Sequence, residues 1–309
     1  MGHLDGRVVI VTGAGRGVGR GHALTMAAEG ASVVVNDLGG AQDGSGGEIG
    51  PAQEVVNEIV AAGGKAIANG DSVTDAEGVK RMIQTAVDEF GDLHGVVNNA
   101  GILRDRMLVS MSEEDFDQVL NVHLKGTWLM MHHAGNYWRE KTKAGEDISA
   151  SIVNTSSTSG LHSNIGQSNY GPAKSAIATL SIIGAKELGR YGVRVNALAP
   201  AARTRMTLST PGLGERIGEP EDGGFDMWDP INISPLVAWL CKDDCPATGQ
   251  VYWIMGGRLA RYQEWAKADI AETDGMWDIE ELGRVASEWE TGIVLSRDQK
   301  IAAVETLEW

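Results

Sequence analysis

Three residues in the middle of the chain have side chains that together could move a proton. Tyr170 and Lys174 are four residues apart in a helical stretch, so their side chains share one face. A free tyrosine has a pKa of about 10 and is protonated at neutral pH, but a nearby ammonium group favours the phenolate. Ser157, at the end of the preceding apolar segment, could polarise an oxygen. The set predicts acid–base chemistry on a hydroxyl or carbonyl group, with Tyr170 as the proton carrier.

A glycine-rich loop near the amino terminus could bind the pyrophosphate of a dinucleotide. Residues 12–19 (TGAGRGVG) lie between an apolar, β-branched segment and a helical one. Glycines allow the tight turn and the close approach of backbone N–H groups, and the start of the helix adds a partial positive charge. The loop residues expected to contact the cofactor are Gly13, Arg16, Gly17, Val18 and Gly19.

Asp37 ends the second predicted strand, where a ribose-binding carboxylate is expected. Such a carboxylate accepts hydrogen bonds from ribose hydroxyls and repels a 2′-phosphate, which favours NAD over NADP. Arg16 keeps NADP as the alternative, because a guanidinium beside the ribose could bind that phosphate. Leu38 is expected to contact the same part of the cofactor.

Strand and helix patterns alternate along most of the chain, which predicts an α/β, Rossmann-type, doubly wound parallel sheet of about seven strands with helices on both faces. The predicted strands cover residues 7–12, 31–37, 65–69, 95–101, 151–157, 193–200 and 250–257. The predicted helices cover residues 18–30, 51–62, 75–90 with Thr74 as cap, 112–134 with Ser112 as cap, 168–190 and 234–242. We expect a single dinucleotide-binding catalytic domain over 1–309, with a lid-like substrate loop at 208–230 and a C-terminal extension from about residue 263.

Charge and composition exclude several classes of partner. The chain has 42 acidic and 26 basic residues and a net charge of −16, which would repel nucleic acid and an anionic membrane surface. No apolar run is long enough to cross a membrane, and the amino terminus does not resemble a signal peptide, so we expect a cytoplasmic protein. Cys241 and Cys245 are too few for a disulfide framework and lack neighbouring ligands, so no metal site is predicted.

The order and spacing of these motifs resemble the short-chain dehydrogenase/reductase family over about residues 5–260. The matching residues are the loop at 12–19, Asn98-Asn99-Ala100-Gly101, Ser157, and Tyr170 with Lys174. The resemblance implies a nicotinamide-dependent oxidoreductase in which Ser157, Tyr170, Lys174 and Asn121 are catalytic, Asn121 supporting a water-mediated proton path. It also implies cofactor contacts from Asp71, Ser72, Val73, Asn99, Ala100, Gly101, Tyr170, Lys174 and Pro200.

Residues 36–40, 98–106 and 234–245 resemble, within that family, the (3R)-hydroxyacyl-CoA dehydrogenase domain of peroxisomal multifunctional enzyme type 2 and its bacterial stand-alone relatives. The implied substrate is a 3-hydroxyacyl-CoA from lipid or steroid side-chain oxidation, and Arg203 and Arg205 are candidates for the CoA 3′-phosphate. One alternative is a dehydrogenase or reductase of a steroid or other lipid ketone, possibly NADP-linked. The second is a non-catalytic dinucleotide-binding protein. Helices apolar on more than one face predict a homodimer or homotetramer.

Overall fold

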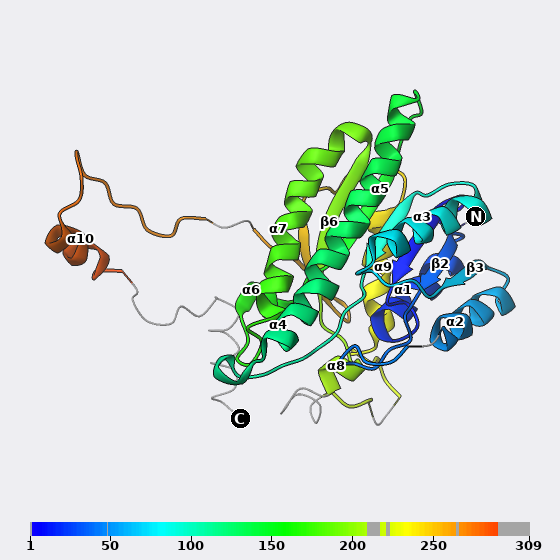
Figure 1. Ribbon diagram of the computed structural model, residues 1–309, viewed down its shortest axis with the longest axis horizontal. Helices are drawn as coiled ribbons and strands as arrows, with labels where there is room; N and C mark the ends of the chain where they lie inside the picture. Colours follow the sequence, from blue (N-terminus) through cyan, green and yellow to red (C-terminus); the bar gives the residue numbers. More distant parts are fainter. Residues whose placement is uncertain (1, 48, 209–216, 221–222, 264–265, 290–309) are drawn as a thin grey trace. The chain divides into compact units, whose positions relative to one another are not determined.

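An eight-stranded sheet forms the centre of the structure. The computed structural model describes residues 2–47, 49–208, 217–220, 223–263 and 266–289. The chain divides into two units, Met1–Tyr262 and Gln263–Trp309, and the sheet belongs to the first (Figure 1). This boundary falls where we expect the C-terminal extension to begin, and a single catalytic domain over the whole chain stays a prediction.

The order of the strands is β3-β2-β1-β4-β5-β6-β7-β8. The strands are β1 (Val8–Thr12), β2 (Ser32–Asn36), β3 (Lys65–Asn69), β4 (Gly95–Asn98), β5 (Ala150–Thr155), β6 (Val193–Pro200), β7 (Val251–Met255) and β8 (Arg258–Arg261). β1 to β7 are parallel, which confirms the predicted doubly wound sheet. β8 adds an antiparallel eighth strand that the sequence does not predict, because RLAR is exposed throughout and lacks an apolar pattern.

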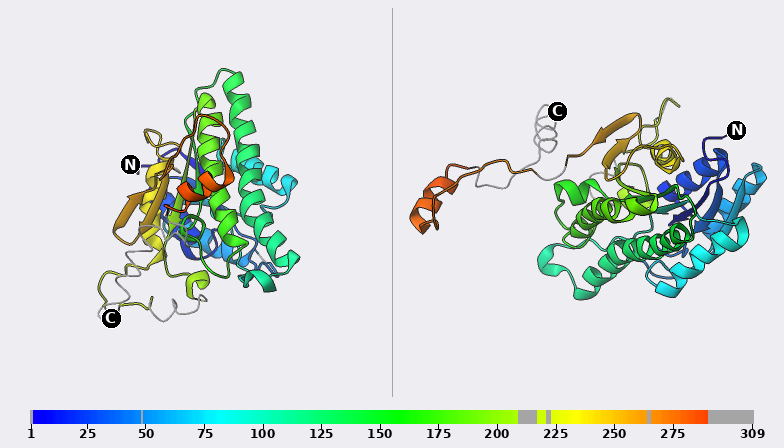
Figure 2. Two further views of the ribbon diagram at one scale, coloured as in Figure 1. Left: turned by 90° about the vertical axis from the view of Figure 1, so that its left-hand side faces the viewer. Right: turned by 90° about the horizontal axis from the view of Figure 1, so that it is seen from above.

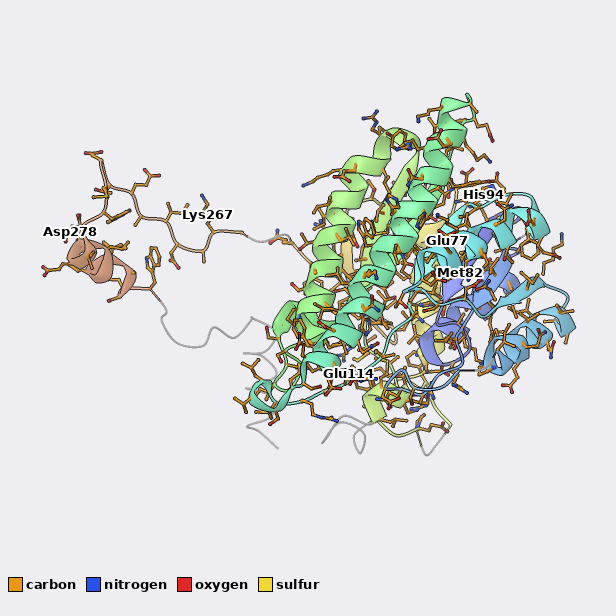
Figure 3. All side chains as sticks on the ribbon, in the orientation of Figure 1. Glu77, Met82, His94, Glu114, Lys267 and Asp278 are labelled. Carbon is orange, nitrogen blue, oxygen red and sulfur yellow. The ribbon has the colours of Figure 1, made fainter. Side chains whose placement is uncertain are left out.

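Helices cover both faces of this sheet because its strands are apolar on both sides. One face packs against α1 (Gly17–Ala28), α2 (Gly50–Ala61) and α9 (Ser234–Cys241), and the other against α3 (Ala76–Phe90), α5 (Gly126–Lys143) and α7 (Tyr170–Leu188) (Figure 2). On α3, Met82 is fully buried whereas the Glu77 side chain is 69% exposed (Figure 3). The strand order reverses where β1 meets β4, and the ligand-binding crevice of such sheets lies at that point.

The helix predicted from Ser112 is interrupted. Ser112 is its cap, since Oγ accepts a hydrogen bond from the Asp115 N–H at 3.1 Å. Helix α4 (Glu113–Leu120) then continues through a π-helical turn, Asn121–Lys125, into α5. Such turns alter which face of a helix its residues occupy and are frequent at functional sites. The predicted cap Thr74 is wrong, because the Asp75 side chain accepts from the Glu77 N–H at the start of α3.

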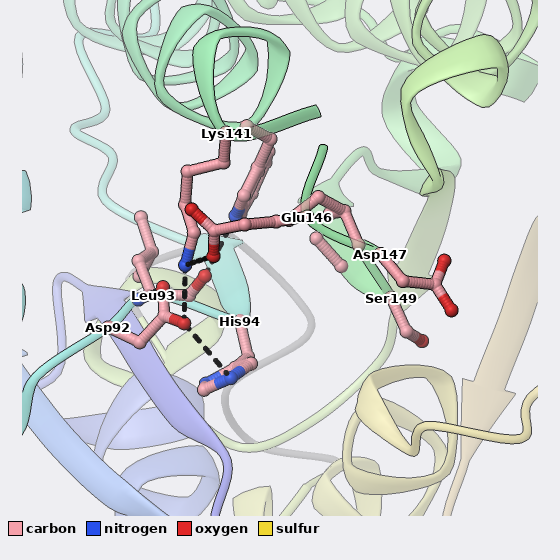
Figure 4. Close-up of a pocket in the computed structure, with 10 residues that line it drawn as sticks. Asp92, Leu93, His94, Lys141, Glu146, Asp147 and Ser149 are labelled. Atoms are coloured by element: carbon pink, nitrogen blue, oxygen red, sulfur yellow. Dashed lines mark hydrogen bonds and ion pairs between the residues drawn. The ribbon is translucent and has the colours of Figure 1, made fainter. Parts of the chain in front are cut away.

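A charged cluster lies at the opposite edge of the sheet, beside the amino ends of β4 and β5 (Figure 4). Lys141 Nζ lies 2.6 Å from Asp92 Oδ2 and 3.0 Å from Glu146 Oε2, and the Tyr137 hydroxyl donates to Asp92 Oδ1 at 2.7 Å. Burial disfavours the ammonium form, but these contacts outweigh it and raise the pKa of Lys141. The cluster fastens the end of α5 to the start of β4.

Shorter helices and the second unit complete the described structure. The first unit also has α6 (Thr158–His162) and α8 (Arg205–Leu208), and the second has α10 (Ile279–Ala286). Residues 209–216 and 221–222 of the predicted lid lie outside the described residues. Cys241 and Cys245 are buried free thiols, and the described residues contain no cluster suited to a metal ion. Within those residues, no helix has the length and apolarity required to cross a membrane.

Candidate active site

A cavity of about 530 Å³ opens at the carboxyl ends of the parallel strands. Residues that follow β1, β2, β4 and β5 line it, among them Gly13, Asp37, Asn99 and Ser157. Its position is the crevice where open α/β sheets bind ligands, and its volume suits a small-molecule or cofactor site.

The structure brings almost all the predicted site residues to this cavity. The lining contains Gly13, Arg16, Gly17, Val18, Gly19, Asp37, Leu38, Asp71, Ser72, Val73, Asn99, Ala100, Gly101, Ser157, Tyr170, Lys174 and Pro200. Asn121 is the exception: it opens the π-helical turn, and its neighbours Val122 and His123 line the cavity instead.

The glycine loop packs tightly against the segment after β4. Gly13 has φ +63°, and a Cβ there would lie 2.8 Å from the Ala100 Cα. A Cβ on Gly19 would lie 2.1 Å from the Gly13 carbonyl oxygen. The Asn99 side-chain amide donates to the carbonyls of Thr12 and Gly13, both at 3.1 Å. These contacts fix the turn that leads into α1.

The amino end of α1 leaves its backbone donors available to an anion. Arg16 is the N-cap residue and makes no side-chain capping hydrogen bond, and the first turn holds no acidic residue. The first N–H groups of a helix lack partners within it and attract phosphate. Asp37 borders this region, where its Oδ2 accepts from the Gly15 N–H at 2.8 Å and its Oδ1 from the Gly39 N–H at 2.7 Å.

The end of β5 and the first turn of α7 place the three central side chains together. Ser157 caps α6, with Oγ accepting from the Ser159 N–H at 3.1 Å. Tyr170 begins α7, and Lys174 lies one turn later and is only 3% exposed. Lys174 Nζ donates to the Thr155 carbonyl at 2.6 Å and lies 5.6 Å from the centre of the Tyr170 ring.

Burial acts in opposite directions on Tyr170 and Lys174. Loss of hydration raises the pKa of Tyr170 to about 12, although a hydrogen bond with Ser157 lowers it. Loss of hydration also lowers the pKa of Lys174 to about 7. The chain's own contacts therefore keep Tyr170 as the neutral phenol. Additional positive charge in the cavity would favour the phenolate.

His123 is a buried cavity residue that the sequence does not single out. Its ring lies edge-on to Tyr170, with the ring centres 5.1 Å apart, and its Nε2 is 2.8 Å from the Ile102 carbonyl oxygen. Burial lowers its pKa well below the usual range, so it is neutral at physiological pH. Helical periodicity alone could not show that a π-helical turn directs this ring toward Tyr170.

The two arginines after β6 differ in their surroundings. The Arg203 guanidinium pairs with Asp226 and donates to the carbonyls of Ile217 and Gly218 at 3.2 and 3.1 Å. Arg205 is exposed and lines the cavity. Of these two residues, Arg205 is therefore the one placed to meet an anionic part of a ligand.

Several proteins of known family are similar to this chain. The sequence model of the short chain dehydrogenase family matches residues 7–211. A short-chain type dehydrogenase/reductase of Mycobacterium tuberculosis is 46% identical over 258 residues, which cover 84% of this chain and 85% of that protein. The hydroxyacyl-CoA dehydrogenase ChsB1 of the same species is 39% identical over 287 residues, covering 90% and 87%. Peroxisomal multifunctional enzyme type 2 of Mus musculus is 40% identical over 258 residues, covering 84% of this chain but 33% of the mouse protein.

Comparison of the fold with solved structures indicates the same family as the sequence comparisons. The crystal structure of a short chain dehydrogenase from Mycobacterium avium matches with a TM-score of 0.82 and 50% identity, covering 93% of this chain and 95% of that one. Members of this family bind nicotinamide dinucleotide cofactors. The chain belongs to the short-chain dehydrogenase/reductase family and is an oxidoreductase.

Proposed function

We propose that the enzyme oxidises a 3-hydroxyacyl-CoA to the 3-ketoacyl-CoA with NAD. The observation that carries this proposal is one cavity lined both by the glycine loop and by Ser157, Tyr170 and Lys174. Similarity over most of both chains to ChsB1, a hydroxyacyl-CoA dehydrogenase, supports the substrate class.

The residues present fit a dinucleotide. The unpaired N–H groups at the start of α1 suit the pyrophosphate, and a side chain at Gly13 or Gly19 would clash with the neighbouring backbone. Asp37 and Leu38 would hold the adenosine ribose, and Asp71, Ser72 and Val73 the adenine. Asn99, Ala100, Gly101 and Pro200 would line the nicotinamide side.

We propose NAD rather than NADP because of Asp37. Two backbone N–H groups, from Gly15 and Gly39, fix its carboxylate at the cavity. Each carboxylate oxygen has a second lone pair that could accept from a ribose hydroxyl. The negative charge would repel a 2′-phosphate. Arg16 lines the same cavity, so NADP stays the alternative.

Tyr170 is the proposed proton carrier. Ser157 Oγ would hydrogen-bond the substrate oxygen while the Tyr170 phenolate accepts the hydroxyl proton. When bound, oxidised NAD supplies a hydride acceptor and a positive charge. Lys174, fixed by the Thr155 carbonyl, would add to that charge in its protonated form and bind the nicotinamide ribose. Asn121, outside the lining, would act through water on the proton path.

A CoA thioester is favoured over a free steroid or lipid ketone by one feature, the exposed guanidinium of Arg205 at the cavity. A 3′-phosphate is a suitable partner for such a group. The charge of Arg203 is already paired with Asp226, so Arg203 is less suited to bind a phosphate. A free steroid or other lipid ketone is therefore the second candidate substrate.

We also propose a homodimer or homotetramer. Trp128 of α5 is 47% exposed and Ile183 of α7 is 44% exposed, although both helices belong to the layer that packs on the sheet. Large apolar side chains exposed on neighbouring helices are typical of subunit interfaces.

Tyr170→Phe removes only the ionisable hydroxyl. We expect kcat to fall by about 10² to 10⁴, the usual contribution of a positioned acid–base group. NADH binding, measured by fluorescence titration, should change little. Tyr191→Phe is the matched control, because Tyr191 lies outside the cavity lining. Full turnover by Tyr170→Phe would instead favour a different mechanism. Absence of turnover in the wild-type protein as well would favour the non-catalytic alternative.

A substrate panel tests the proposed reaction. The rates of NAD and NADP reduction would be measured by the absorbance of the reduced nicotinamide. They would be compared for 3-hydroxyacyl-CoAs, the matching 3-hydroxyacyl-pantetheine thioesters and hydroxysteroids. We expect turnover of the CoA thioesters with NAD, and a higher KM for them in Arg205→Gln with no change for the pantetheine thioesters. Activity confined to free steroids would move the assignment to the second candidate.

Light scattering during size-exclusion chromatography tests the quaternary structure. We expect a mass of two or four chains, and lower apparent association for Trp128→Ser combined with Ile183→Ser. A monomer at micromolar concentration would contradict the proposed oligomer.

A further inference from the structure

The loop after β2 crosses the cavity and reaches the segment after β4. We define the strap as residues 39–47. The Leu103 N–H donates to the Gln42 carbonyl at 3.0 Å, and Arg104 Nε donates to the Asp43 carbonyl at 2.8 Å. β1 lies between β2 and β4 in the sheet. The strap therefore passes over the carboxyl end of β1, where the glycine loop begins.

The strap is a preformed turn. The Ala41 N–H donates to the Ser45 carbonyl at 2.8 Å, and the Ser45 N–H and hydroxyl donate to Asp43 Oδ1 at 3.0 and 2.7 Å. Gly39 and Gly44 have φ +73° and +89°, conformations that favour glycine. A segment of this kind can move as a body about its glycines once its outer contacts break.

Its inner side belongs to the cavity. Gly40, Ala41, Gln42 and Gly44 all contribute to the lining that also contains Gly13 and Gly19. A Cβ on Gly44 would lie 3.2 Å from the Ile102 side chain, so the strap packs closely on the segment after β4. A dinucleotide in contact with the glycine loop would lie beneath the strap, and its release would require the strap to move.

Arg104 joins the strap to the helix that carries Tyr170. Its Nη1 lies 3.4 Å from Asp115 Oδ1 and 3.4 Å from Glu114 Oε1, on the first turn of α4 (Glu114 is labelled in Figure 3). Its carbonyl accepts from the Asn169 side chain at 2.9 Å, and Asn169 Oδ1 accepts from the Tyr170 N–H at 2.7 Å. One residue thus touches the strap, α4 and the start of α7.

Arg104 and Asp115 are partly buried, which distinguishes their contact from a fully exposed ion pair. Its side chain is 20% exposed, and the Asp115 side chain is 18% exposed. Fully exposed pairs contribute little because water screens them. A partly buried guanidinium that donates to a backbone carbonyl and faces two carboxylates is held in a more defined geometry.

We propose that the strap closes over the bound dinucleotide and that Arg104 is the positioning residue whose side chain latches the strap to α4. The proposal rests on dinucleotide binding in this cavity and is independent of the substrate. Cofactor release is then governed by the opening of the strap, which requires the Arg104 side chain to leave the Asp43 carbonyl.

The test compares Arg104→Gln with Arg104→Lys and with Arg139→Gln, which loses only an exposed pair with Glu140 on α5. NADH dissociation is followed by stopped-flow fluorescence. Strap opening is followed by hydrogen exchange of the Leu103 amide, which donates to the Gln42 carbonyl of the strap and is called strap exchange below. We expect Arg104→Gln to speed dissociation about tenfold or more, the usual effect of losing a hydrogen bond to a charged group. Strap exchange without nucleotide should also rise in Arg104→Gln. Arg104→Lys should show a smaller rise in both dissociation and exchange, and Arg139→Gln should change neither.

Unchanged dissociation and unchanged strap exchange in a folded Arg104→Gln protein would overturn the proposal. If that variant does not fold, Gly44→Ala decides, since its Cβ strains the left-handed turn of the strap and crowds the contact with Ile102. It must speed dissociation and strap exchange, and wild-type values would overturn the proposed closure of the strap. Failure of the wild-type protein to bind NADH or NADPH would contradict the proposed function. Nucleotide binding that leaves the exchange of the Leu103 amide unslowed would contradict only the proposed closure of the strap.

Discussion

The burial of Lys174 against Tyr170 is the constraint on which the site depends. The Thr155 carbonyl holds the lysine at the end of β5, where water is largely excluded. The same lack of water raises the pKa of Tyr170 to about 12 and lowers that of Lys174 to about 7, so the chain alone favours the neutral form of the phenol. A site of this kind becomes basic only when a further positive charge enters it. We infer that cofactor binding and the activation of Tyr170 are coupled by electrostatics.

The sheet supplies the geometry that this coupling requires. The reversal of strand order between β1 and β4 opens one crevice, and the glycine loop and the end of β5 both reach it. The tight packing of Gly13 and Gly19 against the segment after β4 fixes the cofactor side. The π-helical turn places the ring of His123 edge-on against the ring of Tyr170. In our account the strap completes the enclosure and excludes water from the reacting groups.

The parts of the site that the sequence predicts are those with local signals. Tyr170 and Lys174 are one helical turn apart, and Ser157 and Asp37 follow apolar strands, so periodicity alone places them at one edge of the sheet. His123 depends on a helix irregularity, and the contact of Arg104 with Asp43 joins loops 61 residues apart. Strand β8 is recognisable only through its pairing with β7, because its own residues are all exposed. Long-range contacts of these kinds leave no periodic pattern in the sequence.

The most direct test of the coupling is a spectroscopic titration of Tyr170. The ultraviolet absorbance of tyrosinate would be measured against pH as the difference between the wild-type protein and Tyr170→Phe, first alone and then saturated with oxidised NAD. We predict a pKa near 12 for the protein alone and a value at least about 2 pH units lower with oxidised NAD, because the added positive charge favours the phenolate. An unchanged pKa in saturated protein would contradict the account.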